Sequence, residues 1–174
     1  TGNILGVALP MLVAQILSLL YNIVDRIYIA RIPSVGTTAL GAVGLCFPII
    51  VLITAFSNLF GSGGAPLFSI NRGKGNIKKA EAIMNTSFSM LCICGVTLMV
   101  IGMLFASPIL VLFGASEEGL SYAYPYMMIY LIGTVPSMIA TGMNPFINAQ
   151  GYATSGMLSV TIGAVANLIL DPLF

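Results

Sequence analysis

Three long stretches of this chain contain no charged side chain, and they constrain its fold more than any other feature. They cover residues 32–71, 82–116 and 119–170. A helix that crosses the hydrocarbon core of a membrane needs roughly 20 consecutive, mostly apolar residues. The first two stretches each hold one such helix, and the third, 52 residues long, holds two and the start of another. With the apolar run from Ile4 to Val24, the pattern predicts five membrane spans.

The amino-acid composition excludes a water-soluble globular domain. Charged residues make up 6% of the chain and hydrophobic residues 58%, whereas soluble domains carry about 25% charged residues. Such a chain cannot cover its surface with polar groups, so composition and patterning both indicate an integral membrane protein. The net charge of +1 gives no basis for binding nucleic acid.

The spans are expected to form an all-α, polytopic helical bundle. Charges, Gly and Pro interrupt the apolar runs and mark the loops. The expected helices lie at about 4–29, 39–70, 83–113, 120–149 and 157–174. Because the chain starts without Met and ends within an apolar run, we expect it to be a piece of a longer protein.

One loop carries most of the positive charge. Two of the six basic residues lie elsewhere: Arg26 near the end of the first expected helix and Arg31 just after it. Cytoplasmic loops of membrane proteins are enriched in Lys and Arg. The loop between the second and third helices is therefore expected in the cytoplasm, together with the N-terminus two spans earlier, because it contains Arg72, Lys74, Lys78 and Lys79.

The first expected helix carries a polar stripe. Its members are separated by three, four and three residues, which places them on one helical face: Gln15, Ser18, Asn22 and Asp25. Lipid cannot satisfy polar groups, so the stripe must face protein or a watery cavity. It either lines a cavity or joins helices by hydrogen bonds. Asp25, followed by Arg26, could also be a solvated interfacial residue.

Two carboxylates are candidates for ion binding. Asp25 and Asp171 both fall at or near membrane level, where ionisable residues are costly and usually functional. Asn167 lies one turn before Asp171 on the same face. An amide oxygen and a carboxylate suit Na⁺, whereas desolvation of a carboxyl suits proton binding. Both readings stay open, as does a structural role for Asp171 at the kink expected from Pro172.

Other polar and small residues are less specific. Asn144 and Asn148 share a helical face and would line a cavity or join neighbouring helices. The glycine-rich segment 61–64 lacks the Gly-Lys-Ser/Thr ending of a phosphate loop, so it indicates close helix packing or a hinge. The three cysteines lie in apolar runs without any His to complete a metal site, and we expect them to pack as small core residues.

Five segments resemble motifs of the multidrug and toxin extrusion (MATE) transporters, in the same order and spacing. Together they extend over nearly the whole chain: residues 21–30 (YNIVDRIYIA), 58–64 (NLFGSGG), 72–82 (RGKGNIKKAEA), 146–151 (FINAQG) and 167–174 (NLILDPLF).

The resemblance implies twelve helices in two six-helix lobes, of which this chain would be the N-terminal lobe without its sixth helix. It is similar to the DinF-like and staphylococcal multidrug branches. It implies a secondary antiporter of the cell membrane that exports cationic or amphiphilic drugs in exchange for Na⁺ or H⁺. It assigns cation binding to Asp25, Asn167 and Asp171, with Na⁺ as a metal candidate at the last two. It implies no enzyme activity, no catalytic residue and no cofactor.

Other functions fit the residues less well. A flippase for lipids or lipid-linked oligosaccharides would line its cavity with Arg and Lys, which the spans nearly lack. An intramembrane aspartyl protease needs a Gly-x-Gly-Asp setting, but Asp171 follows Leu-Ile-Leu. A non-transporting scaffold would tolerate loss of both acids. The partners expected are a small-molecule drug, the bilayer and the remaining helices of the parent chain.

Overall fold

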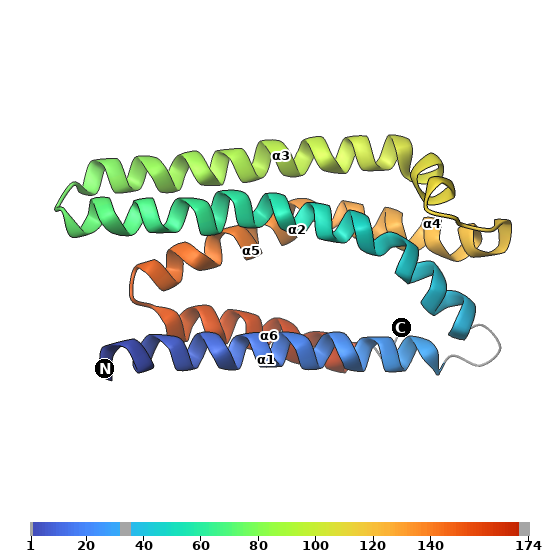
Figure 1. The fold of residues 1–174 in the computed structure, drawn as a ribbon, viewed down its shortest axis with the longest axis horizontal. Coiled ribbons are helices and arrows are strands. Elements are labelled where there is room, and N and C mark those ends of the chain that lie inside the picture. The colour runs from blue at the N-terminus through green and yellow to red at the C-terminus, as the bar shows by residue number, and fades with distance from the viewer. Residues whose placement is uncertain (1, 32–35, 171–174) are drawn as a thin grey trace. The chain divides into compact units, whose positions relative to one another are not determined.

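The structure, a computed structural model, describes residues 2–31 and 36–170 and is helical nearly throughout (Figure 1). Within these residues there is no β-strand. The all-α prediction is therefore confirmed. The helices are α1 (Gly2–Ala30), α2 (Gly36–Gly73), α3 (Ile77–Leu112), α4 (Glu117–Ile132), α5 (Thr134–Ala149) and α6 (Ala153–Leu170).

The first three helices are long and apolar enough to cross a membrane. Their spanning parts are Ala8–Ala30, Gly36–Gly73 and Ile77–Leu112. The pair α4 and α5 supplies a fourth span if the two helices are taken together. In α6 the apolar part is the shorter stretch Ala153–Ala166. The described helices thus have the lengths and composition of an integral membrane bundle.

The segment predicted as one helix over residues 120–149 is two helices in the structure. They are bent by 56° at Gly133. Pro136 has no N–H to donate to the carbonyl of Ile132, and its ring crowds that carbonyl, so regular hydrogen bonding ends there. Pro125 and Pro145 lie within α4 and α5 without ending them. The break therefore needs the Gly133 cap as well as the proline.

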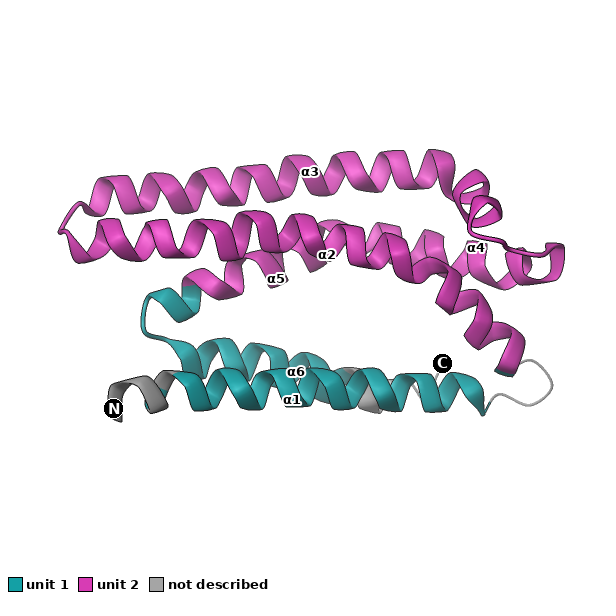
Figure 2. Cartoon of the chain, in the orientation of Figure 1, with its two compact units in different colours: residues 1–36, 147–174 teal, residues 37–146 magenta. Residues whose placement is uncertain are grey.

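The chain divides into two compact units (Figure 2). Unit 1 contains residues 1–36 and 147–174, and unit 2 contains residues 37–146. In unit 1, α1 and α6 pack side by side, and Figure 1 shows them running in the same direction. In unit 2, α2 and α3 form a long antiparallel hairpin, and α4 packs against α3.

Buried residues of unit 2 recur at helical spacing and form one stripe on each helix. In α3 they are four or seven residues apart, and in α4 and α5 they follow each other at every fourth position. Lipid tails are as apolar as Leu, so packing contacts rather than the hydrophobic effect hold such helices together. The stripes are Ala80, Ser87, Leu91, Gly95, Gly102, Ala106 and Leu110 in α3, then Gly119, Ala123, Met127 and Leu131 in α4, and Thr134, Met138, Gly142 and Phe146 in α5.

Glycines bring the helices of unit 2 into close contact. A Cβ added to Gly142 of α5 would lie 2.6 Å from the Leu91 side chain of α3. One added to Gly64 of α2 would lie 2.6 Å from the Ser87 hydroxyl of α3. The prediction that the glycine-rich segment 61–64 serves close packing agrees with this geometry. Cys46 is buried in the same core, as expected, and its thiol donates to the Ala123 carbonyl at 3.7 Å.

Three interhelical turns share one design. Gly75, Gly114 and Gly151 have φ values of +76°, +93° and +92°, which L side chains rarely adopt. At each turn the glycine N–H donates to the carbonyl three residues before it, and the next N–H donates to the carbonyl five residues before it. These paired bonds satisfy the last carbonyls of the preceding helix. The glycines therefore determine where α2, α3 and α5 end.

Candidate functional site

The polar stripe of α1 is only partly on the half-buried face of that helix. Ser18 and Asp25 lie on this face, whereas Gln15 and Asn22 are exposed. Asn22 donates its side-chain amide to the Ser18 carbonyl at 2.7 Å, one turn earlier. Asp25 also has an interaction partner. The face recurs every three or four residues and comprises Pro10, Ala14, Leu17, Ser18, Tyr21, Val24, Asp25 and Ile29.

The helix that carries Asn167 lies beside the helix that carries Asp25. Because α1 and α6 run in the same direction within unit 1, the end of α6 lies along the second half of α1 (Figure 1). Asn167 is in the last turn of α6, in the backbone of that helix. Asp171 lies outside the described residues. The two helices predicted to hold the cation are therefore neighbours, and the ligand set itself stays a prediction.

Two asparagines lie one turn apart near the end of α5. Asn144 and Asn148 are both half-buried, and both have interaction partners. Their spacing puts them on one face, as predicted. Half-buried amides offer both donors and acceptors to a polar ligand or to a neighbouring helix. Their assignment to a cavity wall is a prediction.

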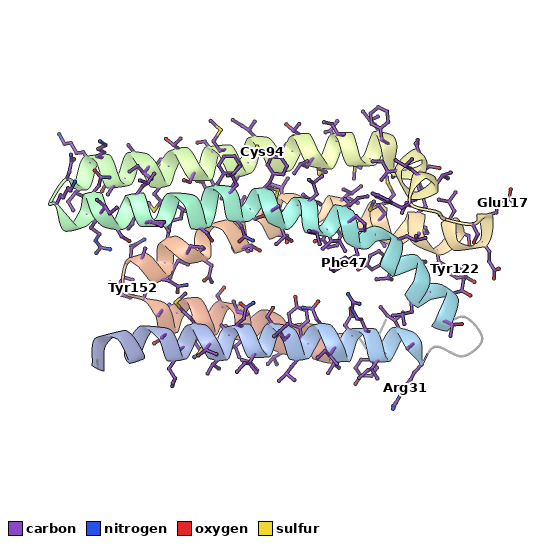
Figure 3. The ribbon with its side chains drawn as sticks, viewed as in Figure 1. Arg31, Phe47, Cys94, Glu117, Tyr122 and Tyr152 are labelled. Carbon is purple, nitrogen blue, oxygen red and sulfur yellow. The ribbon has the colours of Figure 1, made fainter. Side chains whose placement is uncertain are left out.

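Acids and thiols do not gather into a transition-metal site in the part of the chain that the structure describes. There, no three His, Cys, Asp or Glu side chains come together. The thiols of Cys92 and Cys94 are half-buried in α3. Glu117 and Arg31 point away from the ribbons at helix ends, as Figure 3 shows.

Sequence reasoning missed three buried polar residues: Ser57, Ser87 and Thr134. The hydroxyl of Ser57 donates to the Ile53 carbonyl at 3.1 Å, and that of Thr134 to the Tyr130 carbonyl at 3.3 Å. The Ser57 bond stays within α2, whereas the Thr134 bond runs from α5 back to the last turn of α4; both satisfy a buried hydroxyl locally. All three occur at helical spacing from other small residues of the core, and this spacing is the sequence signal that could have identified them.

Comparison with known proteins decides the family. The family model described as MatE matches residues 10–173. This chain belongs to the MATE family. The predicted resemblance is thus confirmed, and with it the membrane location of the helices.

Relatives of this MATE chain include transporters with different named cargoes. It is 28% identical over 170 residues to the FAD transporter of Shewanella oneidensis, covering 98% of this chain and 37% of the relative. It is 28% identical over 166 residues to the multidrug export protein MepA of Staphylococcus haemolyticus, covering 95% and 36%. The chain therefore spans a little over a third of the length of these relatives.

Solved structures agree with this assignment. One of them is the outward-facing conformation of a multidrug resistance MATE family transporter of the MOP superfamily. It matches with a TM-score of 0.90 and 26% identity, covering 99% of this chain and 38% of that one. A MOP superfamily transporter from Pyrococcus furiosus, described as having a binding pocket of reverse polarity, matches with the same TM-score and identity, covering 99% and 37%.

Proposed function

We propose that this MATE chain is part of a secondary active antiporter that exports cationic or amphiphilic compounds across the cell membrane in exchange for Na⁺ or H⁺. The observation that carries the proposal is the family match over residues 10–173. Multidrug exporters among the relatives support the cargo class. The N-terminus is proposed to lie in the cytoplasm, because the basic loop between α2 and α3 favours that side.

The coupling cation is proposed to bind between α1 and α6. Asp25 is half-buried on α1, and α6, whose last turn contains Asn167 and which precedes Asp171 in the sequence, packs beside α1. Two carboxylates and an amide oxygen supply hard ligands for Na⁺, or proton acceptors. The ion shifts the protein between outward and inward states only if it binds one state more tightly. Binding to these residues in one state supplies that difference.

The drug pathway is proposed to use uncharged polar groups. Gln15, Ser18 and Asn22 on α1, and Asn144 and Asn148 on α5, offer hydrogen bonds without a fixed charge. Such groups accept varied cations without a strong preference for one. The remaining helices of the parent chain complete the pathway, since this chain covers 37% of a relative.

A second candidate cargo is an anionic dinucleotide. The FAD transporter that this chain resembles at 28% identity favours this alternative. FAD carries negative phosphates, so its recognition requires positive groups in the cavity. The spans described here contain few charges, and such groups would come from the rest of the parent chain. A lipid flippase has no comparable support among these relatives.

Efflux by the full parent protein tests the proposal. Cells that express the wild type or Asp171→Asn are loaded with ethidium, and a Na⁺ or a proton gradient is imposed. We expect one gradient to drive efflux and the variant to abolish it. Release of FAD without ethidium efflux would instead support the dinucleotide cargo. Ethidium efflux that persists in Asp171→Asn would refute the assigned cation site.

A further inference from the structure

Four of the six Lys and Arg residues of the chain gather at one hairpin turn. Arg72 lies in the last turn of α2, Lys74 in the connection, and Lys78 and Lys79 in the first turn of α3. All four side chains are exposed. Glu81 is the acid nearest in sequence, and it is exposed as well. The hairpin turn, residues 72–79, therefore carries a net positive charge toward its surroundings.

The backbone of the hairpin turn is held in one conformation. Gly75 N–H donates to the Arg72 carbonyl and Asn76 N–H to the Asn71 carbonyl, both at 3.0 Å. The side chain of Asn76 then accepts from the Lys79 N–H at 3.2 Å. Asn76 thus ends α2 and caps α3 at the same time. The basic residues are therefore presented from a hydrogen-bonded turn.

Arg72 also contacts an aromatic ring of its own helix. Its guanidinium lies 6.0 Å from the centre of the Phe68 ring, within the range of cation–π attraction. Phe68 is 5% exposed and packs edge-on against Phe146, with ring centres 5.7 Å apart. The guanidinium is therefore anchored on a buried aromatic pair. Arg72 is exposed, and the planar fork of guanidinium N–H groups matches phosphate oxygens.

The lysines occupy an electrostatically unfavourable place. The N-terminus of a helix carries partial positive charge, and cations there are destabilising. The first turn of α3 contains Lys78 and Lys79 and no acid. Asn76 caps the turn without adding negative charge. An external anion beside the hairpin turn would offset both the lysine charges and the helix dipole.

The position of the turn determines which anion it meets. Both α2 and α3 have the length and composition of membrane spans, so their connection lies on one side of the membrane, outside its hydrocarbon core. Apolar side chains next to the basic residues are exposed: Leu67 by 55%, Ile70 by 52% and Ile77 by 49%. A surface that is basic and apolar within a few residues matches a phospholipid, whose phosphate lies directly above its acyl chains.

We propose that the hairpin turn is a binding site for the phosphate of an acidic phospholipid. Arg72 and the three lysines contact the headgroup, and Leu67, Ile70 and Ile77 contact the first acyl carbons. The site shares no residue with the cation site proposed on α1 and α6. It does not depend on the cargo or the coupling ion, and its role is to stabilise the α2–α3 hairpin in the membrane.

The test compares lipids on the purified full-length parent protein. Thermal unfolding is followed in detergent after addition of phosphatidylglycerol or phosphatidylcholine. We expect phosphatidylglycerol to raise the Tm by several degrees more than phosphatidylcholine, and high salt to reduce the difference because it screens charges. Equal shifts with the two lipids would refute the proposal. If glycerol phosphate raised the Tm as much as phosphatidylglycerol, the ligand would be a soluble anion and the lipid proposal would be wrong.

Variants locate the site. The variant Arg72→Gln/Lys74→Gln/Lys78→Gln/Lys79→Gln should lose most of the phosphatidylglycerol shift. The variant Lys74→Arg/Lys78→Arg/Lys79→Arg should keep it. Arg31→Gln removes an exposed charge from the end of α1 and should also keep it. If the fourfold variant does not fold, Lys74→Gln alone should reduce the shift, because Lys74 lies outside both helices. A full shift in the glutamine variants would refute the proposal.

Discussion

A Cβ atom placed on Gly61 of α2 would lie 2.9 Å from the Cα of Gly142 of α5, so the two helices cross in backbone contact. Both residues belong to unit 2 and both are buried. Without a hydrophobic driving force in lipid, the stability of such a crossing comes from close packing between small residues. Adding one methyl group at this contact should therefore change the stability of the protein measurably.

Gly61→Ala should destabilise the parent protein by about 1–3 kcal/mol, the usual range for an overpacked contact. The added methyl group meets backbone atoms, which cannot rotate away. Gly63→Ala is the matched control, because a Cβ there has nothing within 4 Å. Thermal unfolding in detergent measures both variants. Equal stability of the two would show that α2 and α5 do not meet at Gly61.

Gly75→Ala should destabilise the α2–α3 hairpin by roughly 1–2 kcal/mol, the cost of placing an L side chain in a left-handed conformation. Its φ is +76°, and a Cβ there meets no neighbour, so the cost comes from the backbone alone. Gly73→Ala, two residues earlier in α2 and also in open space, should cost nothing. Thermal unfolding again distinguishes them. A neutral Gly75→Ala would mean that the turn adopts another conformation.

Pro136→Ala should reduce the bend between α4 and α5. The substitution restores an N–H that can donate to the Ile132 carbonyl and removes the ring that crowds it. Spin labels at the exposed positions Ser121 and Thr141 report the change as a distance. A straight helix would separate the two backbone positions by about 30 Å, and a bend shortens this. Pro125→Ala, inside α4, should leave the distance unchanged; an unchanged distance in Pro136→Ala would assign the bend to Gly133.

Asp25→Asn should lower ion-coupled efflux at least tenfold in the full parent protein, while protein levels stay normal. The change keeps the size of the side chain and removes the charge that the proposed site supplies to the cation. Glu117→Gln makes the same change at an exposed position of α4 and should leave efflux intact. Substrate efflux in cells under each gradient is the measurement. If Asp25→Asn retained wild-type efflux, Asp25 would be an interfacial residue and not a cation ligand.

Much of this architecture could be read from local features. The charge-free stretches predict membrane helices, because the cost of a charge in lipid does not depend on how the rest of the chain folds. Expected ends of the second and third helices at residues 70 and 113 lie within three residues of the observed Gly73 and Leu112. The glycines that end helices act on their own neighbours in the chain. The break at Gly133 was missed because six other prolines lie inside helices without ending them.

The candidate site was less accessible from the sequence. Spacing placed Ser18 and Asp25 on one face of α1, because helical periodicity is local. It also placed Gln15 and Asn22 there, although these two are exposed. Spacing along one helix does not show which neighbour covers which side of it. The sequence by itself thus determined a membrane-spanning, all-helical chain with an acid on its first helix, whereas the second candidate acid, Asp171, lies outside the described residues. Only the tertiary structure decided that α1 lies beside α6, and that Gly61 meets Gly142, because both depend on contacts between residues far apart in the chain.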